Sequence, residues 1–530
     1  MYIIIDAIWN GLCAYATYRF FQTFLKNEKT AVLAFILAYF GSGISGMILL
    51  VKWIWGGVSA GLWAPQIITG GWSGENHSIS HEFMDGNALT TMTIMSRVHY
   101  LMPRFFGLFS LVNFYEALEE EQIGSKKIIF SALFIFLAAF FHPASGQVFM
   151  VMMLILGGLM WLRCTDDSRR RSILAAGLIP VIGFLGAAAY WQIYRMNPNA
   201  GDMVTAYLQI LHNTDLVTVW LAVFPMFALS LWIIFRRTPE KQFYFALLIA
   251  TGFSTVGFSE FIVQGYNVKL RLLFLGLAFL TVAVTIWIKR SYLISLLSTT
   301  SEKIWIPVLF GIWFSAAVAI AASPHHDFRK MIHEGVLNLG GATPFVKKLS
   351  NLGNFVFAAR FKLGIWLPLS GLCAYLIHEY LPERKRVVVS ILFVIMLPST
   401  VLYVFATSKS GNIPVAEYEA MRFLREQPNG NVMCAGQAGV FLPNIALMRC
   451  FGNAAADANV VKHRKDSERF WLSSTIEEQM PILKEYRIQY LYLSQEEQKL
   501  LKQPNLLTYY EKIYDKNGVQ IFRVNNTITN

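Results

Sequence analysis

Residues 128–162, with the sequence IIFSALFIFLAAFFHPASGQVFMVMMLILGGLMWL, form two apolar runs that meet at His142-Pro143. The stretch contains no Asp, Glu, Lys or Arg, and Pro143 and Gly146 supply turn residues between the runs. Such runs are typical of helices that cross a membrane. Because each run is short, a re-entrant path for one of them stays open. At the break, we favour an interfacial turn with a hydrogen-bonded His142 over a histidine that faces a cavity.

The same apolar character extends over most of the chain. Of the 530 residues, 55% are hydrophobic and only 15% are charged, whereas soluble domains carry about 25% charged residues. This composition excludes an ordinary soluble enzyme and a disordered chain. Further apolar runs lie near residues 2–25, 31–56, 98–116, 172–192, 217–235, 242–258, 270–288, 304–322, 363–381 and 387–406. We therefore expect an α-helical polytopic membrane protein with about 11–12 transmembrane segments. Residues 1–407 would form its transmembrane domain, and residues 408–530 a soluble α/β domain.

The basic residues indicate an orientation in the membrane. If every run crosses, the alternate loops on one face hold 17 Lys or Arg in 52 residues, a higher density than in the opposite loops. These basic loops are 26–30, 117–127, 163–172, 236–241, 289–303 and 382–386. By the positive-inside rule they are cytoplasmic. The C-terminal domain and the large loops 57–97 and 323–362 are then extracytoplasmic, and the formal charge of +12 calls for anionic lipid rather than nucleic acid.

Because successive spans alternate in direction, the cytoplasmic position of loop 26–30 places the start of the chain outside. The apolar run at Tyr2 follows Met1 directly, and it lacks the basic start and the small-residue cleavage site of a signal peptide. We therefore expect a further span upstream of this sequence.

The composition changes after the last apolar run. Residues 415–425 match an amphipathic helix, and a second helix fits near 474–486. Strands are expected at 431–434, 446–451, 489–493 and 519–524. Together these elements predict a two-layer or three-layer α/β domain. Its glycines do not form the GxGxxG pattern of a dinucleotide site. Of the five cysteines in the chain, only Cys434 and Cys450 share this region, and a disulfide and two buried thiols are both open.

Loop 57–97 contains the densest group of residues that can perform acid–base or metal chemistry. His77 and His81 are four residues apart, so on a helix they would share one face. Glu82 and Asp85 add carboxylates that can act as a general base or bind a divalent metal. We take His81, Glu82 and Asp85 as candidate catalytic residues, and His77 and His81 as candidate metal ligands. A solvated polar loop is the alternative, because no ligand set is complete.

Some cations lie at the outer ends of spans, although the positive-inside rule places most Lys and Arg on the cytoplasmic side. Arg104, Lys269 and Arg271 are the main examples, and they predict a site for a lipid phosphate, which Arg binds as a fork and Lys as a point charge. The alternative is that these side chains reach to outer-leaflet headgroups.

Several classes of membrane protein are disfavoured. The runs between residues 172 and 288 carry no ionisable residue at mid-membrane depth, which argues against an ion-coupled transporter. The chain also contains no Walker motif and no GxSxG elbow, which argues against an ATPase and a serine hydrolase.

The layout resembles the C-type superfamily of integral-membrane glycosyltransferases, which use polyprenyl-phosphate-linked sugars. The resemblance covers most of the chain: the many spans, the polar outer loops, Arg104 and Arg271 at helix ends, the His142-Pro143 break, and an α/β tail ending Tyr509-Tyr510-Glu511-Lys512-Ile513-Tyr514. In that family a first outer loop carries an acidic catalytic residue. Residues 12–34 are similar to the family's segment on the C-terminal side of that loop, so the loop itself would precede Tyr2. Asp6 would belong to the end of that site, although a helix N-terminal carboxylate explains it equally.

The resemblance implies a transferase of hexosyl or pentosyl groups in a prokaryotic plasma membrane. Its partners would be a polyprenyl-phosphate lipid, the surrounding membrane lipids, and a glycan or lipid acceptor on the extracytoplasmic face. A carboxylate would activate the acceptor hydroxyl, and cations would hold the leaving lipid phosphate. A lipid or polysaccharide transporter and a noncatalytic envelope scaffold are the alternatives, and a divalent metal cofactor is open.

Overall fold

A computed structural model of the chain describes residues 2–41, 98–196, 216–238, 241–257, 301–321, 363–410, 413–434, 438–451 and 460–524, with isolated positions elsewhere. The described chain is mostly helical and has one small sheet near its C-terminus. It divides into two compact units. The helical unit comprises Met1–Trp191 and Leu211–Ser410, and the tail unit comprises Gln192–Ile210 and Gly411–Asn530.

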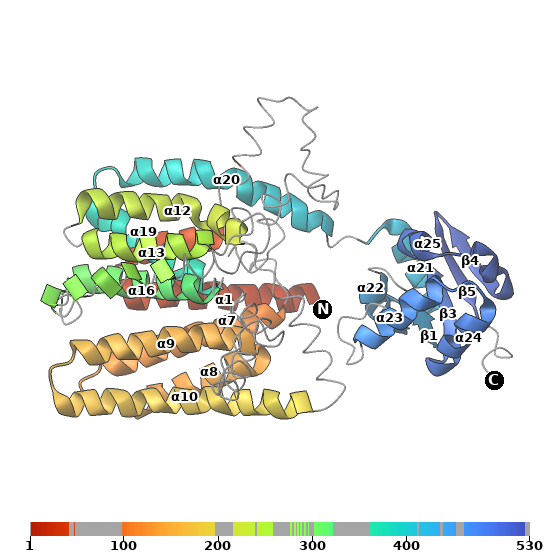
Figure 1. The fold of residues 1–530 in the computed structure, drawn as a ribbon, viewed down its shortest axis with the longest axis horizontal. Helices are drawn as coiled ribbons and strands as arrows, with labels where there is room; N and C mark the ends of the chain where they lie inside the picture. Colours follow the sequence, from red (N-terminus) through yellow and green to blue (C-terminus); the bar gives the residue numbers. More distant parts are fainter. Residues whose placement is uncertain are drawn as a thin grey trace. The chain divides into compact units, whose positions relative to one another are not determined.

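The helices of the helical unit run side by side (Figure 1). They are α1 (Tyr2–Leu25), α2 (Glu28–Phe40), α7 (Val98–Glu119), α8 (Ser125–Phe141), α9 (Pro143–Arg163), α10 (Asp167–Met196), α12 (Leu216–Arg237), α13 (Lys241–Gly257), α16 (Glu302–Ala321), α19 (Leu363–Tyr380) and α20 (Lys385–Ser410). Each apolar run predicted from the sequence therefore coincides with a helix wherever the structure describes it. The runs 31–56 and 270–288 lie partly or largely outside the described residues.

Within the described ranges, three helices are long and apolar enough to cross a membrane: Pro143–Arg163, Asp167–Tyr194 and Ile304–Ala321. The helix Pro143–Arg163 corresponds to the second of the two apolar runs in residues 128–162. The helical content and these three candidate spans agree with the predicted class at a coarse level.

Helix α19 lies at the centre of the helical unit. Every residue from Gly364 to Ile377 is buried, so this helix is covered on all sides, as its continuous apolar sequence requires. Buried tryptophans still need a partner for the indole N–H. Trp366 of α19 donates to the Ala38 carbonyl oxygen at 3.0 Å, and Trp313 of α16 donates to the Met152 carbonyl oxygen at 2.8 Å. These bonds tie helices that are far apart in sequence.

Helices α8 and α9 meet at one residue, with no loop between them. His142 ends α8 and caps the start of α9, where its Nδ1 atom accepts a hydrogen bond from the Ser145 backbone N–H at 3.1 Å. Pro143 then occupies the first position of α9, where a missing N–H is tolerated. This geometry confirms the prediction of a turn with a hydrogen-bonded histidine.

The tail unit contains a five-stranded mixed sheet of order β2-β1-β3-β5-β4. β1 pairs in parallel with β2 and β3, whereas β5 pairs antiparallel with β3 and β4. Its elements are α21 (Val415–Arg425), β1 (Asn431–Met433), α22 (Ala438–Ile445), β2 (Arg449–Phe451), α23 (Val460–Trp471), α24 (Ile476–Glu485), β3 (Ile488–Leu493), α25 (Gln495–Leu500), the 3-10 helix η5 (Pro504–Tyr509), β4 (Glu511–Lys516) and β5 (Val519–Arg523).

Both faces of this sheet are covered. Val432 and Tyr492 belong to one core, which includes residues of α21 and α22, whereas Met433 and Leu491 belong to another, which includes residues of α23 and α24. Because side chains alternate along a strand, the two cores lie on opposite faces. The sequence left a two-layer and a three-layer α/β domain open, and the structure has the three-layer form.

The predicted helices and strands of the tail are confirmed, with one boundary wrong. The strand expected from Ala446 begins only at Arg449, because Ala446 forms a turn and Leu447 has a φ of 57°, which lies outside the extended region. The edge strand β4 and the helices α22, α23 and α25 were not predicted.

Candidate functional site

The structure places one of the predicted site residues, Arg104. The candidate catalytic residues His81, Glu82 and Asp85, the candidate metal ligand His77, and the cations Lys269 and Arg271 all lie outside the described residues. Their predicted roles therefore stay predictions.

Arg104 lies in the second turn of α7, directly after Pro103, and is half-buried. Its guanidinium interacts with the Cys13 thiol of α1 and lies within electrostatic range of Tyr39 on α2. Cys13 and Tyr39 are buried, with 0% and 4% of their surfaces exposed. Thr17 lies one turn beyond Cys13 on the same face of α1, and its hydroxyl donates to the Cys13 carbonyl oxygen at 2.8 Å. Three helices thus bring polar groups together in an otherwise apolar bundle; we name Arg104, Tyr39, Cys13 and Thr17 the Arg104 cluster.

Cys13 and Arg104 lie far from the C-terminal ends of their helices. At 1.5 Å of rise per residue, Cys13 is about 18 Å from the end of α1 at Leu25, and Arg104 is about 22 Å from the end of α7 at Glu119. The loops that follow these two helix ends belong to the basic set. The cluster is therefore remote from the face of the bundle where most loop cations gather.

The Tyr39 hydroxyl is an unusual member of the cluster. It is buried and makes no hydrogen bond of ordinary geometry with the described residues, although the Cys13 thiol and the Thr17 hydroxyl both lie near it. Leaving a buried hydroxyl unsatisfied costs about 1–3 kcal/mol, so most buried hydroxyls have a partner in the protein or in ordered water. A phenol and a guanidinium both donate hydrogen bonds, and the guanidinium is always charged. Together they are suited to an oxygen that carries negative charge.

Sequence reasoning found Arg104 but missed its neighbours. A cation at the outer end of a span stands out because it runs against the charge distribution of the loops, whereas Tyr39 and Cys13 are common residues in apolar helices. The spacing of Cys13 and Thr17 was the only available signal, and it does not reveal which helix lies opposite.

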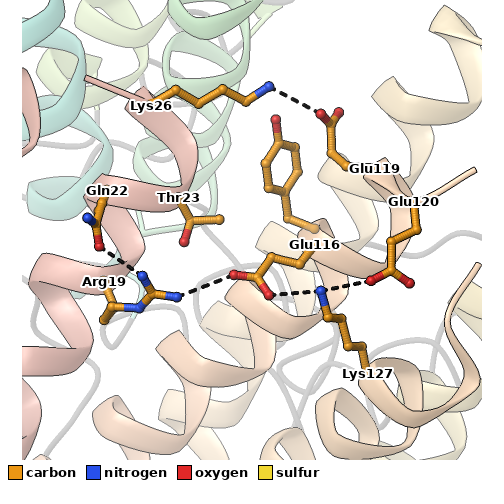
Figure 2. A pocket seen from close by; sticks show the side chains of 9 residues that line it. Arg19, Gln22, Thr23, Lys26, Glu116, Glu119, Glu120 and Lys127 are labelled. Carbon is orange, nitrogen blue, oxygen red and sulfur yellow. Dashed lines mark hydrogen bonds and ion pairs between the residues drawn. The ribbon is translucent and has the colours of Figure 1, made fainter. Parts of the chain in front are cut away.

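A second group of polar residues lines an open pocket of about 420 Å³ between α1, α7 and α8 (Figure 2). Arg19 and Lys127 both pair with Glu116, at 3.5 and 3.2 Å, and Lys127 also contacts Glu120 at 2.8 Å. The hydrogen bond to Glu120 raises the pKa of Lys127. Lys26 pairs with Glu119 at 3.2 Å.

The charges of this pocket compensate one another. Three cations face three carboxylates, and Figure 2 shows that the pairs cross from α1 to α7 and from α7 to α8. Half-exposed ion pairs contribute about 0–1 kcal/mol each, so they align helix ends rather than store much binding energy. We therefore assign this pocket a structural role and take the Arg104 cluster as the candidate site.

The described residues contain no group of three or more His, Cys, Asp or Glu side chains placed to hold a metal ion. No protein-family model matches the chain, and no curated protein is significantly similar to it.

Proposed function

We propose that the chain is an integral-membrane glycosyltransferase that moves a sugar from a polyprenyl-phosphate donor to a glycan or lipid acceptor on the extracytoplasmic face. The observation that carries this proposal is the presence of Arg104 within electrostatic range of the buried Tyr39 hydroxyl, which makes no hydrogen bond of ordinary geometry with the described residues, inside a bundle of apolar helices. Ionisable residues within membrane-spanning segments are rare and are usually functional.

A lipid-linked phosphate fits this cluster better than a soluble anion does. Its isoprenoid chain stays in the hydrocarbon while its phosphate needs donors at the depth of the headgroup or below. In sugar transfer, the bond between the sugar and the phosphate breaks, and the lipid phosphate leaves with additional negative charge. Arg104 would stabilise that charge, and the Tyr39 hydroxyl would donate to a phosphate oxygen. Lys269 and Arg271 are proposed as further cations of the same site.

The base that activates the acceptor is proposed to come from loop 57–97. Glu82, Asp85 and His81 are its candidates, and His77 with His81 would hold a divalent metal if one takes part. A carboxylate within hydrogen-bond reach of the acceptor hydroxyl would remove its proton as the new glycosidic bond forms.

The proposal includes a polytopic topology of about 11–12 spans in a prokaryotic plasma membrane. The contacts of arginines at the end of α9 and the start of α10 support a membrane interface at this level. The guanidinium of Arg163 stacks on the Trp305 ring at 4.3 Å, and that of Arg170 on the Trp161 ring at 5.1 Å. Tryptophan is enriched at the level of the lipid headgroups.

A lipid-binding measurement tests the site. The protein is purified in detergent, and polyprenyl phosphate and phosphatidylglycerol are compared for their ability to raise its melting temperature. We expect selective stabilisation by polyprenyl phosphate, and a Kd about 10- to 100-fold weaker in Arg104→Gln, because a charged hydrogen bond is worth about 1.5–3 kcal/mol. Tyr39→Phe removes only the hydroxyl, so its smaller loss reports on that oxygen.

Arg171→Gln is the matched control, because Arg171 is exposed and lies in the basic loop 163–172. It removes the same charge and should leave the Kd unchanged. Equal responses to the two lipids, or wild-type affinity in Arg104→Gln, would refute the phosphate site. Selective binding without sugar transfer to any acceptor would favour a lipid transporter.

A further inference from the structure

The structure brings together two cysteines of the tail unit that are 16 residues apart in sequence. Cys450 lies in β2 and pairs in register with Val432 of the parallel strand β1. Cys434 follows β1, two residues beyond Val432, so it lies on the same face of the sheet. Its backbone N–H donates to the Phe451 carbonyl oxygen at 3.1 Å, which extends the pairing of the two strands past Cys434.

The two sulfur atoms are in direct contact. The Cys434 and Cys450 Sγ atoms are 2.7 Å apart, closer than sulfur atoms approach without a bond. A disulfide places the two sulfur atoms about 2.05 Å apart, so the pair has only a short distance to close. Both residues are buried, with 0% and 3% of their surfaces exposed, in the core that Tyr492 and Ile521 also form.

Of the cysteines in the chain, only these two lie together. Cys13 and Cys373 are buried within the helical unit, and Cys164 lies between α9 and α10 with its thiol directed to the Asp166 carbonyl oxygen. Three cysteines are therefore expected to keep free thiols, and they provide an internal reference for the other two.

We propose that Cys434 and Cys450 form a disulfide that joins β1 to β2 in the mature protein. This inference uses the extracytoplasmic location of the tail that belongs to the proposed function. The bond forms by exchange with a protein disulfide of that compartment. Each thiol loses its proton, one sulfur–sulfur bond forms between Cys434 and Cys450, and the oxidant's disulfide is reduced to two thiols. Because the pair is buried, the exchange takes place before the tail has folded completely.

Peptide mapping tests the bond directly. The full-length protein is isolated in the presence of an alkylating reagent that blocks free thiols. It is then denatured with the reagent still present, so that buried free thiols also react, and digested with trypsin without reduction. Cleavage after Arg425, Arg449 and Lys462 separates the two cysteines into peptides 426–449 and 450–462. We expect these peptides to appear as one disulfide-linked species that resolves into two upon reduction. Cys164 should be found alkylated in the same sample.

Cys434→Ser and Cys450→Ser each leave one unpaired cysteine and should abolish the linked species. If both tail peptides are alkylated before reduction, the proposal is wrong. Incubating that protein with glutathione disulfide while it refolds then identifies the reason. Formation of the bond would show that the geometry is right and the compartment is reducing, whereas its absence would show that the geometry is wrong. Neither outcome alters the lipid-binding test of Arg104.

Discussion

The Arg169 side chain of α10 caps the C-terminal end of another helix, α7. It lies in the first turn of α10, yet its guanidinium donates to the carbonyl oxygens of Leu118, Glu120 and Glu121 at the end of α7, at 2.9, 2.9 and 3.1 Å. The last carbonyls of a helix have no partner within it, and they carry its negative partial charge. We expect Arg169→Ala to lower the free energy of unfolding by about 1–2 kcal/mol, measured as thermal unfolding in detergent.

Arg171→Ala is the control for this prediction. Both changes remove one cation from the same basic loop, so any effect of charge on membrane topology is matched. Arg171 is exposed, and its removal should change the free energy of unfolding by less than about 0.5 kcal/mol. Equal destabilisation by the two variants would show that the total charge of the loop matters and that the carbonyl contacts do not.

For single residues, the sequence indicates where an unusual charge lies, but it does not indicate which side chains from other helices lie beside it. Arg104 was identified because a cation at the outer end of a span runs against the charge distribution of the loops. Tyr39 was not, since the meaning of a tyrosine in such a run depends on whether its hydroxyl finds a partner across the bundle. That property is set by the packing of α1, α2 and α7, which no local pattern encodes.

Among the elements, the α8–α9 hairpin depends on close contact between its two helices. A Cβ atom added at Gly146 of α9 would lie 2.5 Å from both the Cα and Cβ atoms of Ala139 on α8. Because backbone atoms cannot yield, Gly146→Ala must separate the helices near the turn at His142. We expect this change to lower the free energy of unfolding by about 1–3 kcal/mol, the usual cost of overpacking.

Gly158→Ala on the same helix is the matched control. A Cβ atom there meets nothing within 4 Å, and alanine favours the helix more than glycine does. Its melting temperature should equal or exceed that of the wild type. If the two variants unfold at the same temperature, the close helix contact does not contribute to stability.

Element boundaries followed from the sequence where one physical signal dominated. The helix Val415–Arg425 was predicted from its apolar spacing because one of its faces is buried in the tail core. β4 was missed because Glu511, Lys512, Asp515 and Lys516 make it look like a solvated loop. As an edge strand it pairs on one side only, which permits these exposed charges.

For the whole molecule, the density of basic residues in alternate loops predicts which compartment each end of the chain occupies. Two exposed positions test this: Ser168, in the basic loop 163–172, and Lys516, in the tail. Each is replaced by cysteine in a Cys164→Ser background, where the remaining native cysteines are buried. In right-side-out spheroplasts, a membrane-impermeant maleimide should label Lys516→Cys and not Ser168→Cys. After lysis it should label both, because neither side chain is covered.

The reversed pattern would place the tail in the cytoplasm. It would then remove the oxidising compartment on which the Cys434–Cys450 bond depends. Labelling of both positions in intact spheroplasts would mean that the number of crossings between them is even, so one predicted span would have to be re-entrant. The short runs on either side of His142-Pro143 precede Ser168, so they do not affect the number of crossings between Ser168 and Lys516. The predicted span that does not cross would therefore lie between residues 172 and 406. Labelling of cysteines placed in the loops 236–241 and 382–386 would then locate the span that does not cross.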